Sequence, residues 1–305
     1  MRKATTFLAT GLMLALAGSA LAVTVDGTLD GTYGAALSVQ STQTQFGDAN
    51  INLSDYANGS ELDAAYGRIE GGVLYLLLAG NLESNFNKLE LFFDVAPGGQ
   101  NTLRNDNANI DFNGLNRLAG MTFDAAFSPD YYITTTGGYD GSGYRMFANY
   151  GELLTAGGGA GYYLGSNTPT TCPSGSFCAP GPMAGGTNPN AIEITINNSN
   201  SAGVGGGCAA ASGAGVSTGI ELGIPLTALG SPSTGCIKVF AAINGSSHDF
   251  LSNQVLGPLP AGTCNMGDPS YVDFGMIDGE QYFQVCLNAT SGKKATWGTV
   301  KSMYR

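Results

Sequence analysis

The sequence predicts an all-β fold, an antiparallel, jelly-roll-like β-sandwich with long glycine-rich loops stapled by disulfide bonds. The first observation is a series of hydrophobic runs of strand length, with alternating patterns and short turns between them. The second is the composition, because 47 glycines and only 11% charged residues among 305 are typical of an exported all-β protein with long loops. The third is an even number of cysteines, six, which favours disulfide bonds in an oxidising compartment.

The clearest predicted strands form the centre of a sheet. Segments 62–70 and 73–79 are joined by Gly71 and Gly72, a two-residue connection that suits a tight β-hairpin turn. Segment 73–79 is hydrophobic on both faces, which predicts a strand in the middle of a packed structure. In segment 89–95 every second residue is a large hydrophobic one, so one face of this strand points to a core.

Residues 1–22 are predicted to be a secretory signal peptide. Arg2 and Lys3 form a positive start, the apolar stretch at 7–17 is too short to span a bilayer comfortably, and Ala-Leu-Ala at 20–22 is a cleavage site. A retained anchor helix is the alternative. After cleavage no segment is apolar enough for a transmembrane helix, so we expect no membrane span and a secreted or cell-surface protein, periplasmic or extracellular.

The length of the remaining chain allows one decorated domain or two small ones. We interpret 23–286 as a single β-sandwich domain. Loop insertions are expected at about 155–190 and 198–216, on either side of a strand at 191–197. The last segment, 287–305, is a basic tail.

The charges are segregated along the chain. Residues 23–292 contain six basic and 23 acidic residues, a net charge of −17, while four basic residues lie in the last 13 positions. Because residues 23–292 are so acidic, this part of the chain should repel nucleic acid, and its charge favours cations or neutral sugars as partners. The alternative is that the acidity only keeps an exported protein soluble.

The rest of the chain predicts further strands and almost no helix. Segment 23–34 is predicted to be a short strand with Asp-Gly turns, and 35–60 a strand or extended loop that covers a sheet edge. One helical turn, 226–229, follows Pro225 and ends at Gly230. Other strands are predicted at 121–127, 131–136, 144–150, 217–224, 236–244, 248–256, 272–276 and 280–285.

Segment 96–114 is rich in asparagine and aspartate, which serve turns and also bind calcium. Its end resembles the start of an EF-hand loop, but Gly120 stands where the bidentate glutamate is required, so an EF-hand is excluded. A looser calcium site remains an expectation, with Asp94, Asp106 and Asp111 as its carboxylate ligands. Plain turn chemistry is the alternative use of these residues.

A group of tyrosines marks the predicted hairpin that contains strands 131–136 and 144–150. A tyrosine ring has an apolar face and a polar tip, so such rings could stack on sugar rings. The predicted ligand-binding residues are Tyr131, Tyr132, Tyr139 and Tyr144. The alternative is that they are ordinary strand residues with solvated hydroxyl groups.

All the cysteines lie in the second half of the chain. They are Cys172, Cys178, Cys208, Cys236, Cys264 and Cys286. Cys172 and Cys178 could close a small loop, which would leave the other four to tie a loop to later strands, but the sequence alone allows many pairings. Neither a zinc site nor a catalytic thiol is expected, because no CxxC motif occurs and His248 is the single histidine.

Three stretches carry a family resemblance. They are VDGTLDGTYG at 25–34, the paired strands GGVLYLLLAGNLES and KLELFFDV at 71–95, and GIELGIPLTALG at 219–230. In this order and spacing they resemble the family-9-like carbohydrate-binding modules, sugar-binding relatives of the DOMON-like β-sandwich. The resemblance implies a jelly-roll-like sandwich, calcium in some members, and sugar ends held between aromatic rings.

The chain departs from this family at positions that matter for the ligand. Tyr33 stands where the opening motif carries tryptophan, and no tryptophan precedes Trp297, so a tryptophan-clamped sugar site is not carried over. His248, Lys88 and the methionines form no convincing pair of haem ligands, and no nucleotide-binding motif occurs, so neither haem nor a nucleotide is expected. Asp94 matches the aspartate that closes the second paired strand, and the resemblance implies a metal-binding or loop-anchoring role for it.

The chemistry in the sequence argues against an enzyme. Ser-His-Asp and Cys-His arrangements would rest on His248 alone, and nothing singles out a pair of acids for glycoside cleavage. We expect a non-catalytic exported protein that binds carbohydrate or another extracellular ligand, a glycan or a cell-surface component, with calcium as the expected cofactor. The alternative is a structural or cell-surface assembly protein whose tail acts in sorting or attachment.

Overall fold

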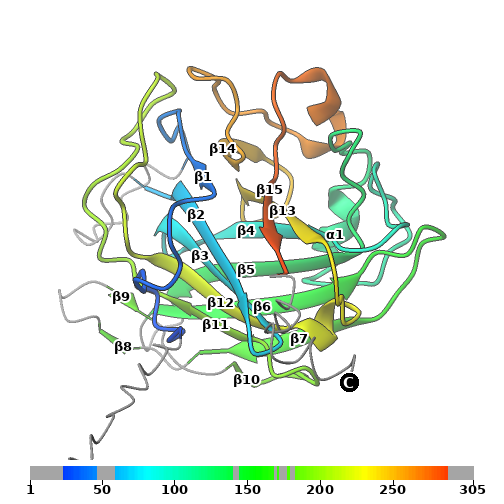
Figure 1. Cartoon of the computed structure of the whole chain (residues 1–305). Helices are drawn as coiled ribbons and strands as arrows, with labels where there is room; N and C mark the ends of the chain where they lie inside the picture. Colours follow the sequence, from blue (N-terminus) through cyan, green and yellow to red (C-terminus); the bar gives the residue numbers. More distant parts are fainter. Residues whose placement is uncertain are drawn as a thin grey trace, which may run out of the picture.

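The protein is an all-β sandwich of two antiparallel sheets (Figure 1). The computed structural model describes residues 23–46, 59–139, 144–167, 170–171, 177–178 and 183–287. Within these residues one sheet has five strands in the order β1-β2-β3-β12-β11. The other has eight strands, in the order β10-β7-β6-β5-β4-β13-β14, with β15 also paired to β13.

The bounds of the elements follow the two sheets. The five-stranded sheet contains β1 (Ser38–Val39), β2 (Glu61–Glu70), β3 (Val73–Asn81), β11 (Glu193–Ile196) and β12 (Gly219–Pro225). The eight-stranded sheet contains β4 (Asn85–Asp94), β5 (Tyr131–Tyr139), β6 (Tyr144–Glu152), β7 (Gly161–Ser166), β10 (Ala184–Gly185), β13 (Cys236–Asn244), β14 (Leu251–Leu256) and β15 (Phe283–Cys286). The remaining elements are β8 (Thr170–Thr171), β9 (Phe177–Cys178), α1 (Gly114–Arg117) and the 3-10 helices η1 (Leu226–Leu229), η2 (Pro269–Tyr271) and η3 (Phe274–Met276).

The main hydrophobic core lies between the two sheets. Because side chains alternate along a strand, Leu74, Leu76 and Leu78 of β3 point inward, where they belong to the same cluster as Leu91 and Phe93 of β4. All five are fully buried. The predicted central hairpin and the predicted strand at 89–95 are therefore confirmed as the centre of the sandwich.

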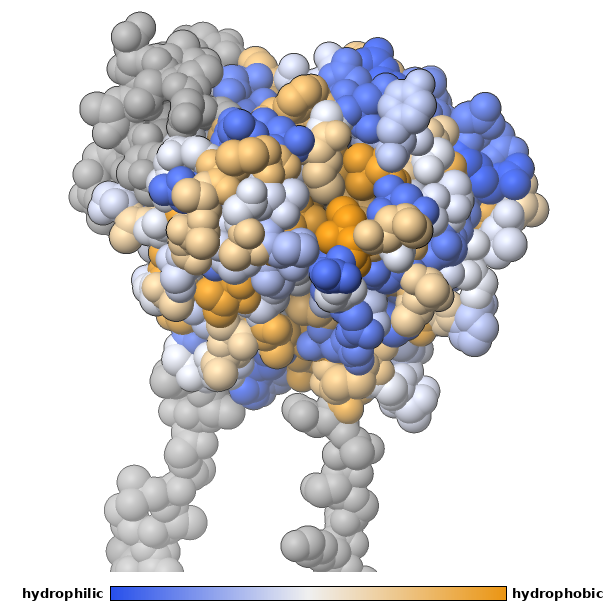
Figure 2. Space-filling model, turned by 90° about the horizontal axis from the view of Figure 1, so that it is seen from above, coloured by the Kyte–Doolittle hydropathy of each residue, from blue (hydrophilic) through white to orange (hydrophobic). Residues whose placement is uncertain are grey.

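A second hydrophobic core lies on the outer face of the eight-stranded sheet. Phe92 and Tyr132 point away from the inner core and pack against rings that include Phe123 and Phe240. Segments 96–127 and 257–282 supply the other side of this core, and we call them the cover. Figure 1 shows α1, which belongs to the cover, beside β4 and β13. Seen from above, the surface intersperses hydrophilic and hydrophobic residues (Figure 2).

Several predicted elements are corrected by the structure. Segment 121–127 is not a strand. It forms turns, and its phenylalanines pack into the second hydrophobic core. Segment 272–276 is not a strand either, because it contains the 3-10 helix η3. Segment 23–34 consists of turns with an isolated bridge, because its backbone bonds to residues near β12 without forming a ladder. Strand β7 lies inside the insertion at 155–190, where glycines at both ends of the strand mask the alternating pattern.

Two disulfide bonds staple the described part of the chain. Cys236 pairs with Cys286 across neighbouring strands β13 and β15, and Cys208 ties the loop at 198–216 to Cys264 in the cover. The disulfide bond that was predicted to close a small loop between Cys172 and Cys178 involves side chains that lie outside the described residues. Disulfide bonds indicate an oxidising compartment. None of the helices in the described ranges is long and apolar enough to cross a membrane.

Candidate functional site

A pocket of about 500 Å³ lies on the outer face of the eight-stranded sheet, beside the cover. Its lining comes from β4, β5 and β6 of the sheet, from β7, and from residues 109–112 of the cover, where Ile110 lies against Gly161 of β7. We call it the sheet pocket. Its lining consists of Phe86, Lys88, Asn109, Ile110, Asp111, Phe112, Thr136, Phe147, Asn149, Gly161, Tyr162 and Tyr163.

The strand register places polar side chains in rows across the floor. Lys88 of β4 pairs with Thr136 of β5, which pairs with Phe147 of β6. In the next row, Asn149 of β6 pairs with Tyr163 of β7. Residues paired across neighbouring strands point to the same face, so these side chains reach the pocket together.

Aromatic rings surround this polar floor. Phe86, Phe112 and Tyr163 keep 41%, 94% and 43% of their surface exposed, although an aromatic side chain in a β-protein is usually buried. Phe147 lies next to Phe86, with ring centroids 6.4 Å apart. The pocket therefore combines ring faces at its mouth with hydrogen-bonding groups beneath them.

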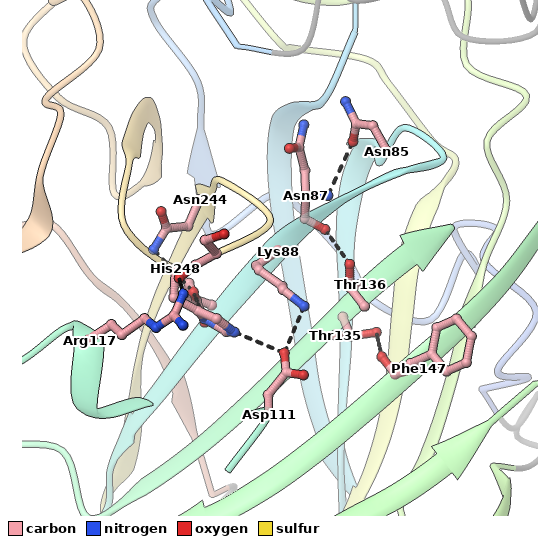
Figure 3. Close-up of polar contacts among 12 residues, drawn as sticks. Asn85, Asn87, Lys88, Asp111, Arg117, Thr135, Thr136, Phe147, Asn244 and His248 are labelled. Carbon is pink, nitrogen blue, oxygen red and sulfur yellow. Dashed lines mark hydrogen bonds and ion pairs between the residues drawn. The ribbon is translucent and has the colours of Figure 1, made fainter. Parts of the chain in front are cut away.

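A chain of ion pairs begins at the pocket and runs into the protein (Figure 3). The Nζ atom of Lys88 lies 2.7 Å from Oδ2 of Asp111, and Nε2 of His248 lies 2.9 Å from the same oxygen. Nδ1 of His248 lies 2.7 Å from Oε1 of Glu90. We call these four residues the charge cluster, and each of their side chains is less than 10% exposed.

Glu90 is the innermost member of the charge cluster. Its carboxylate also accepts a hydrogen bond from the hydroxyl of Tyr132 at 2.6 Å and one from Nδ2 of Asn244 at 3.2 Å. Buried carboxylates are stable only when their charge is paired and their oxygens accept hydrogen bonds. Both requirements are met here, so the cluster joins β4, β5, β13 and the cover.

The pairing sets the charges of the cluster. Burial alone would lower the pKa of His248, but the charge of Glu90 and the hydrogen bonds with Asp111 and Glu90 outweigh it and raise that pKa to about 9. Burial alone would raise the pKa of Asp111, yet the hydrogen bond from His248 and the charge of Lys88 lower it to about 2. The pKa of Glu90 is lowered because the charge and the hydrogen bond of His248 outweigh its burial. At neutral pH both acids are ionised and the imidazole is protonated.

Unusual backbone conformations bring these side chains to the pocket. Asp111, Phe112 and Asn113 have φ values of 45°, 54° and 70°, and His248 has a φ of 59°. Non-glycine residues rarely adopt the left-handed region, and such strain is concentrated at functional sites. The loop of three successive left-handed residues directs Asp111 to the floor and leaves the ring of Phe112 exposed.

Two glycines let the cover approach the sheet. A Cβ atom added at Gly151 would lie 2.2 Å from Cδ1 of Ile110, and one added at Gly161 would lie 2.9 Å from the side chains of Ile110 and Ala108. Any larger residue would force the cover away from β6 and β7. These glycines therefore determine how close Asp111 comes to the sheet.

The tyrosines predicted from the sequence do not share one surface. Tyr132 and Tyr144 are fully buried on opposite faces of the sheet, because one belongs to the outer core and the other to the inner core. Tyr131 is half-buried and stacks on Tyr150. The side chain of Tyr139 lies outside the described residues.

Each aspartate predicted as a calcium ligand has a basic partner. Asp94 lies 3.0 Å from Nζ of Lys238, Asp106 forms an exposed ion pair with Arg104, and Asp111 belongs to the charge cluster. Asp94 also accepts a hydrogen bond from the backbone of Ser128, in line with an anchoring role for the loop. In the part of the chain that the structure describes, no group of three His, Cys, Asp or Glu residues is placed to hold a metal ion.

Two of the three stretches behind the family resemblance, the opening and the late one, meet on the outer face of the five-stranded sheet. Glu221 of β12 is fully buried, and its carboxylate accepts hydrogen bonds from the backbone of Asp26 and Gly27, both at 2.8 Å. The hydroxyl of Tyr33 donates to the same carboxylate at 2.7 Å. The opening and late motifs therefore hold each other in place, and Tyr33 serves this contact.

The sheet pocket was not predicted from the sequence. Lys88 was considered only as a haem ligand and His248 only as a haem, zinc or catalytic residue, and Glu90 and Phe112 were not singled out. One signal was present, since a lysine and a glutamate alternate with hydrophobic residues in segment 88–93, where they must share the outer face. Comparison with family models, curated proteins and solved structures finds no match to this chain.

Proposed function

We propose that the sheet pocket binds a carbohydrate and that the protein acts as a non-catalytic, exported sugar-binding protein. The observation that carries this proposal is the combination of exposed aromatic rings with a polar floor inside one pocket. A sugar ring has an apolar face of C–H groups and an edge of hydroxyl groups, so it matches both parts. Aromatic side chains are the usual partners for ligands that are apolar on one side and polar on the other.

The size of the pocket supports this proposal. A volume of about 500 Å³ lies within the range of small-ligand sites, which is roughly 300–1,000 Å³. The resemblance to family-9-like carbohydrate-binding modules points to the same ligand class. It implies sugar ends between aromatic rings, and Phe86, Phe112 and Tyr163 line this pocket, at positions other than the tryptophan of the opening motif.

The charges of the cluster favour binding over catalysis. A general acid or base works best with a pKa near the working pH, whereas the pKa values of Asp111 and His248 lie near 2 and 9. Glu90 is fully buried beneath the floor. The four groups thus form a fixed set of charges that shapes the pocket.

The proposal is tested by isothermal titration calorimetry of the full chain with oligosaccharides of glucose, xylose, mannose and galactose. We expect at least one series to bind, and Phe112→Ala and Tyr163→Ala to weaken that binding by about fivefold each, since stacking on one ring contributes about 1 kcal/mol. Tyr271→Ala is the matched control, because Tyr271 is 88% exposed and does not line the pocket.

Failure of every sugar series to bind would overturn the proposal. A structural or cell-surface assembly role, with sorting or attachment through the basic tail, would then be the better interpretation. Calcium stays a prediction for this protein. A melting temperature that does not change between calcium and a chelator would remove it, because a ligand of the folded state raises stability by mass action.

A further inference from the structure

We propose that Lys88 and Asp111 together bind two adjacent free hydroxyl groups of a neutral sugar, which makes the sheet pocket selective against uronic acids and O-methylated sugars. This inference rests on the proposed function and names the ligand class more narrowly. It concerns the floor of the pocket, whereas the proposed function is carried by the rings around its mouth.

Lys88 offers hydrogen-bond donors to the pocket. Its ammonium group has three N–H donors, and among the described residues its one hydrogen-bond partner is Oδ2 of Asp111 at 2.7 Å. The side chain is 7% exposed, so it is held almost completely inside the protein while its end lines the pocket. A ligand oxygen is the natural partner for the remaining donors, because a buried donor without a partner is costly.

Asp111 offers an acceptor beside these donors. Its Oδ2 atom accepts from both Lys88 and His248, while no described residue donates a hydrogen bond to its Oδ1 atom. The carboxylate lines the pocket, with its side chain 9% exposed. The remaining N–H donors of Lys88 and the Oδ1 atom of Asp111 belong to two groups that are themselves hydrogen-bonded, so they lie side by side and match two neighbouring hydroxyl groups, one of which accepts while the other donates.

The net charge of the floor favours a neutral ligand. The positive charges of Lys88 and His248 balance the negative charges of Asp111 and Glu90. A uronate carboxylate would bring an additional charge with no unmatched cation to receive it, and it would lie beside Asp111. Burying such a charge is costly, so the pocket should disfavour it.

His248 and Glu90 hold this pair in a fixed geometry. His248 lies between Glu90 and Asp111, and its ring packs so closely on Gly114 that an added Cβ there would lie 2.2 Å from the ring. The left-handed conformation of Asp111 is thereby held before any ligand arrives. A preorganised pair loses less freedom on binding, which increases both affinity and selectivity.

The test compares matched ligands by calorimetry on the full-length wild-type chain. Galactose oligosaccharides are titrated beside oligogalacturonate, and the best binder of the neutral panel is titrated beside its fully O-methylated form. We expect the neutral, unmethylated sugar to bind at least about tenfold more tightly than either counterpart, because a site that bonds hydroxyl groups rejects analogues that lack them.

Variants assign the selectivity to the two residues. Lys88→Met and Asp111→Asn should each weaken binding of the neutral sugar about tenfold and reduce the discrimination against the O-methylated sugar. The double change Arg104→Met with Asp106→Asn is the matched control. It removes an exposed ion pair from the cover, away from the pocket, and should leave both affinities unchanged.

The outcomes separate this inference from the proposed function. If sugars bind and Phe112→Ala weakens them, but O-methylated and uronate ligands bind as tightly as the neutral parent, the hydroxyl assignment is wrong while carbohydrate binding stands. If no sugar binds to the wild type, both fail. The ligand comparison needs no variant, so it decides the matter even where Lys88→Met does not fold.

Discussion

Two fully buried carboxylates occupy opposite outer faces of the sandwich and are stabilised in different ways. Glu90, beneath the sheet pocket, is paired with His248 and lies near Lys88. Glu221, on the five-stranded sheet, is bonded by two backbone N–H groups and the hydroxyl of Tyr33. The first is surrounded by positive charge and the second by neutral donors.

The two environments shift the pKa values of Glu90 and Glu221 in opposite directions. The pKa of Glu90 is lowered, whereas burial raises the pKa of Glu221 to about 7 against the hydrogen bonds from Tyr33 and the backbone. Asp63 resembles Glu221, because burial raises its pKa to about 7 against hydrogen bonds from Val204 and Asn200. Of these three buried acids, only Glu90 has a lowered pKa, because only Glu90 is paired with a buried cationic partner.

The largest expected effect comes from changing the innermost member of the charge cluster, Glu90. Glu90→Gln keeps the shape of the side chain but removes the innermost of the two carboxylates that pair with His248, so that Asp111 alone balances both His248 and Lys88. Removing one partner of a buried ion pair costs about 3–5 kcal/mol, and we expect a loss of that size in the free energy of unfolding at neutral pH. Urea denaturation of the wild type and the variant measures it.

Glu221→Gln is the matched control for this comparison. The glutamine oxygen can accept the two backbone bonds, and the hydroxyl of Tyr33 can turn to accept from the amide, so about 1 kcal/mol should be lost. Equal losses for Glu90→Gln and Glu221→Gln would contradict the distinction between the charged and the neutral environment.

A smaller effect is expected in the pH dependence of stability. Glu221 and Asp63 bind protons more tightly in the folded state, so their contribution is complete below about pH 4 and is lost as the pH rises to about 7. The raised pKa of His248 gives a contribution that is complete below about pH 6.5 and is lost as the pH rises through about 9.

Variants separate these two windows. Urea denaturation from about pH 4 to about pH 10 should show that Glu221→Gln flattens the lower decline and His248→Asn the upper one. Each change should be about 3 kcal/mol, since the two pKa values are raised from 4.5 to about 7 and from 6.5 to about 9, and one pKa unit corresponds to about 1.4 kcal/mol. An upper decline that persists in His248→Asn would show that the histidine is not the group that titrates there.

The smallest effect on stability is expected at the mouth of the pocket. Phe112 is 94% exposed, so Phe112→Ala should change the free energy of unfolding by less than about 0.5 kcal/mol. The same variant should weaken sugar binding, as proposed above. Thermal denaturation checks the first expectation, and a large loss of stability would mean that the ring supports the fold.

The fold was predictable where the signal is local. The strands that form β2, β3, β4, β12 and β13 were anticipated because alternation and short turns are readable within ten residues. The cover was not anticipated. Phe123 looked like part of a strand, yet it packs into a core made by segments that are far apart in the chain.

The site was less predictable than the fold. The tyrosines cluster in the sequence, but their alternation sends Tyr132 and Tyr144 into different cores, so proximity in the chain did not produce a common surface. Lys88, Asp111 and His248 are separated by 23 and 137 residues, and no local pattern links them. Their meeting depends on the register of β4 and β13 and on the left-handed loop.

The sequence by itself determined the class of fold, the acidity, the reliance on disulfide bonds and the inner face of each central strand. These properties depend on composition and on the two-residue period of a β-strand, which every short segment carries. The tertiary structure alone decided which side chains come together on the outer face of the eight-stranded sheet. Residues from the cover, the floor and the turn before β14 form the sheet pocket and the charge cluster only when long-range packing brings them together, because no short segment contains more than one of these parts.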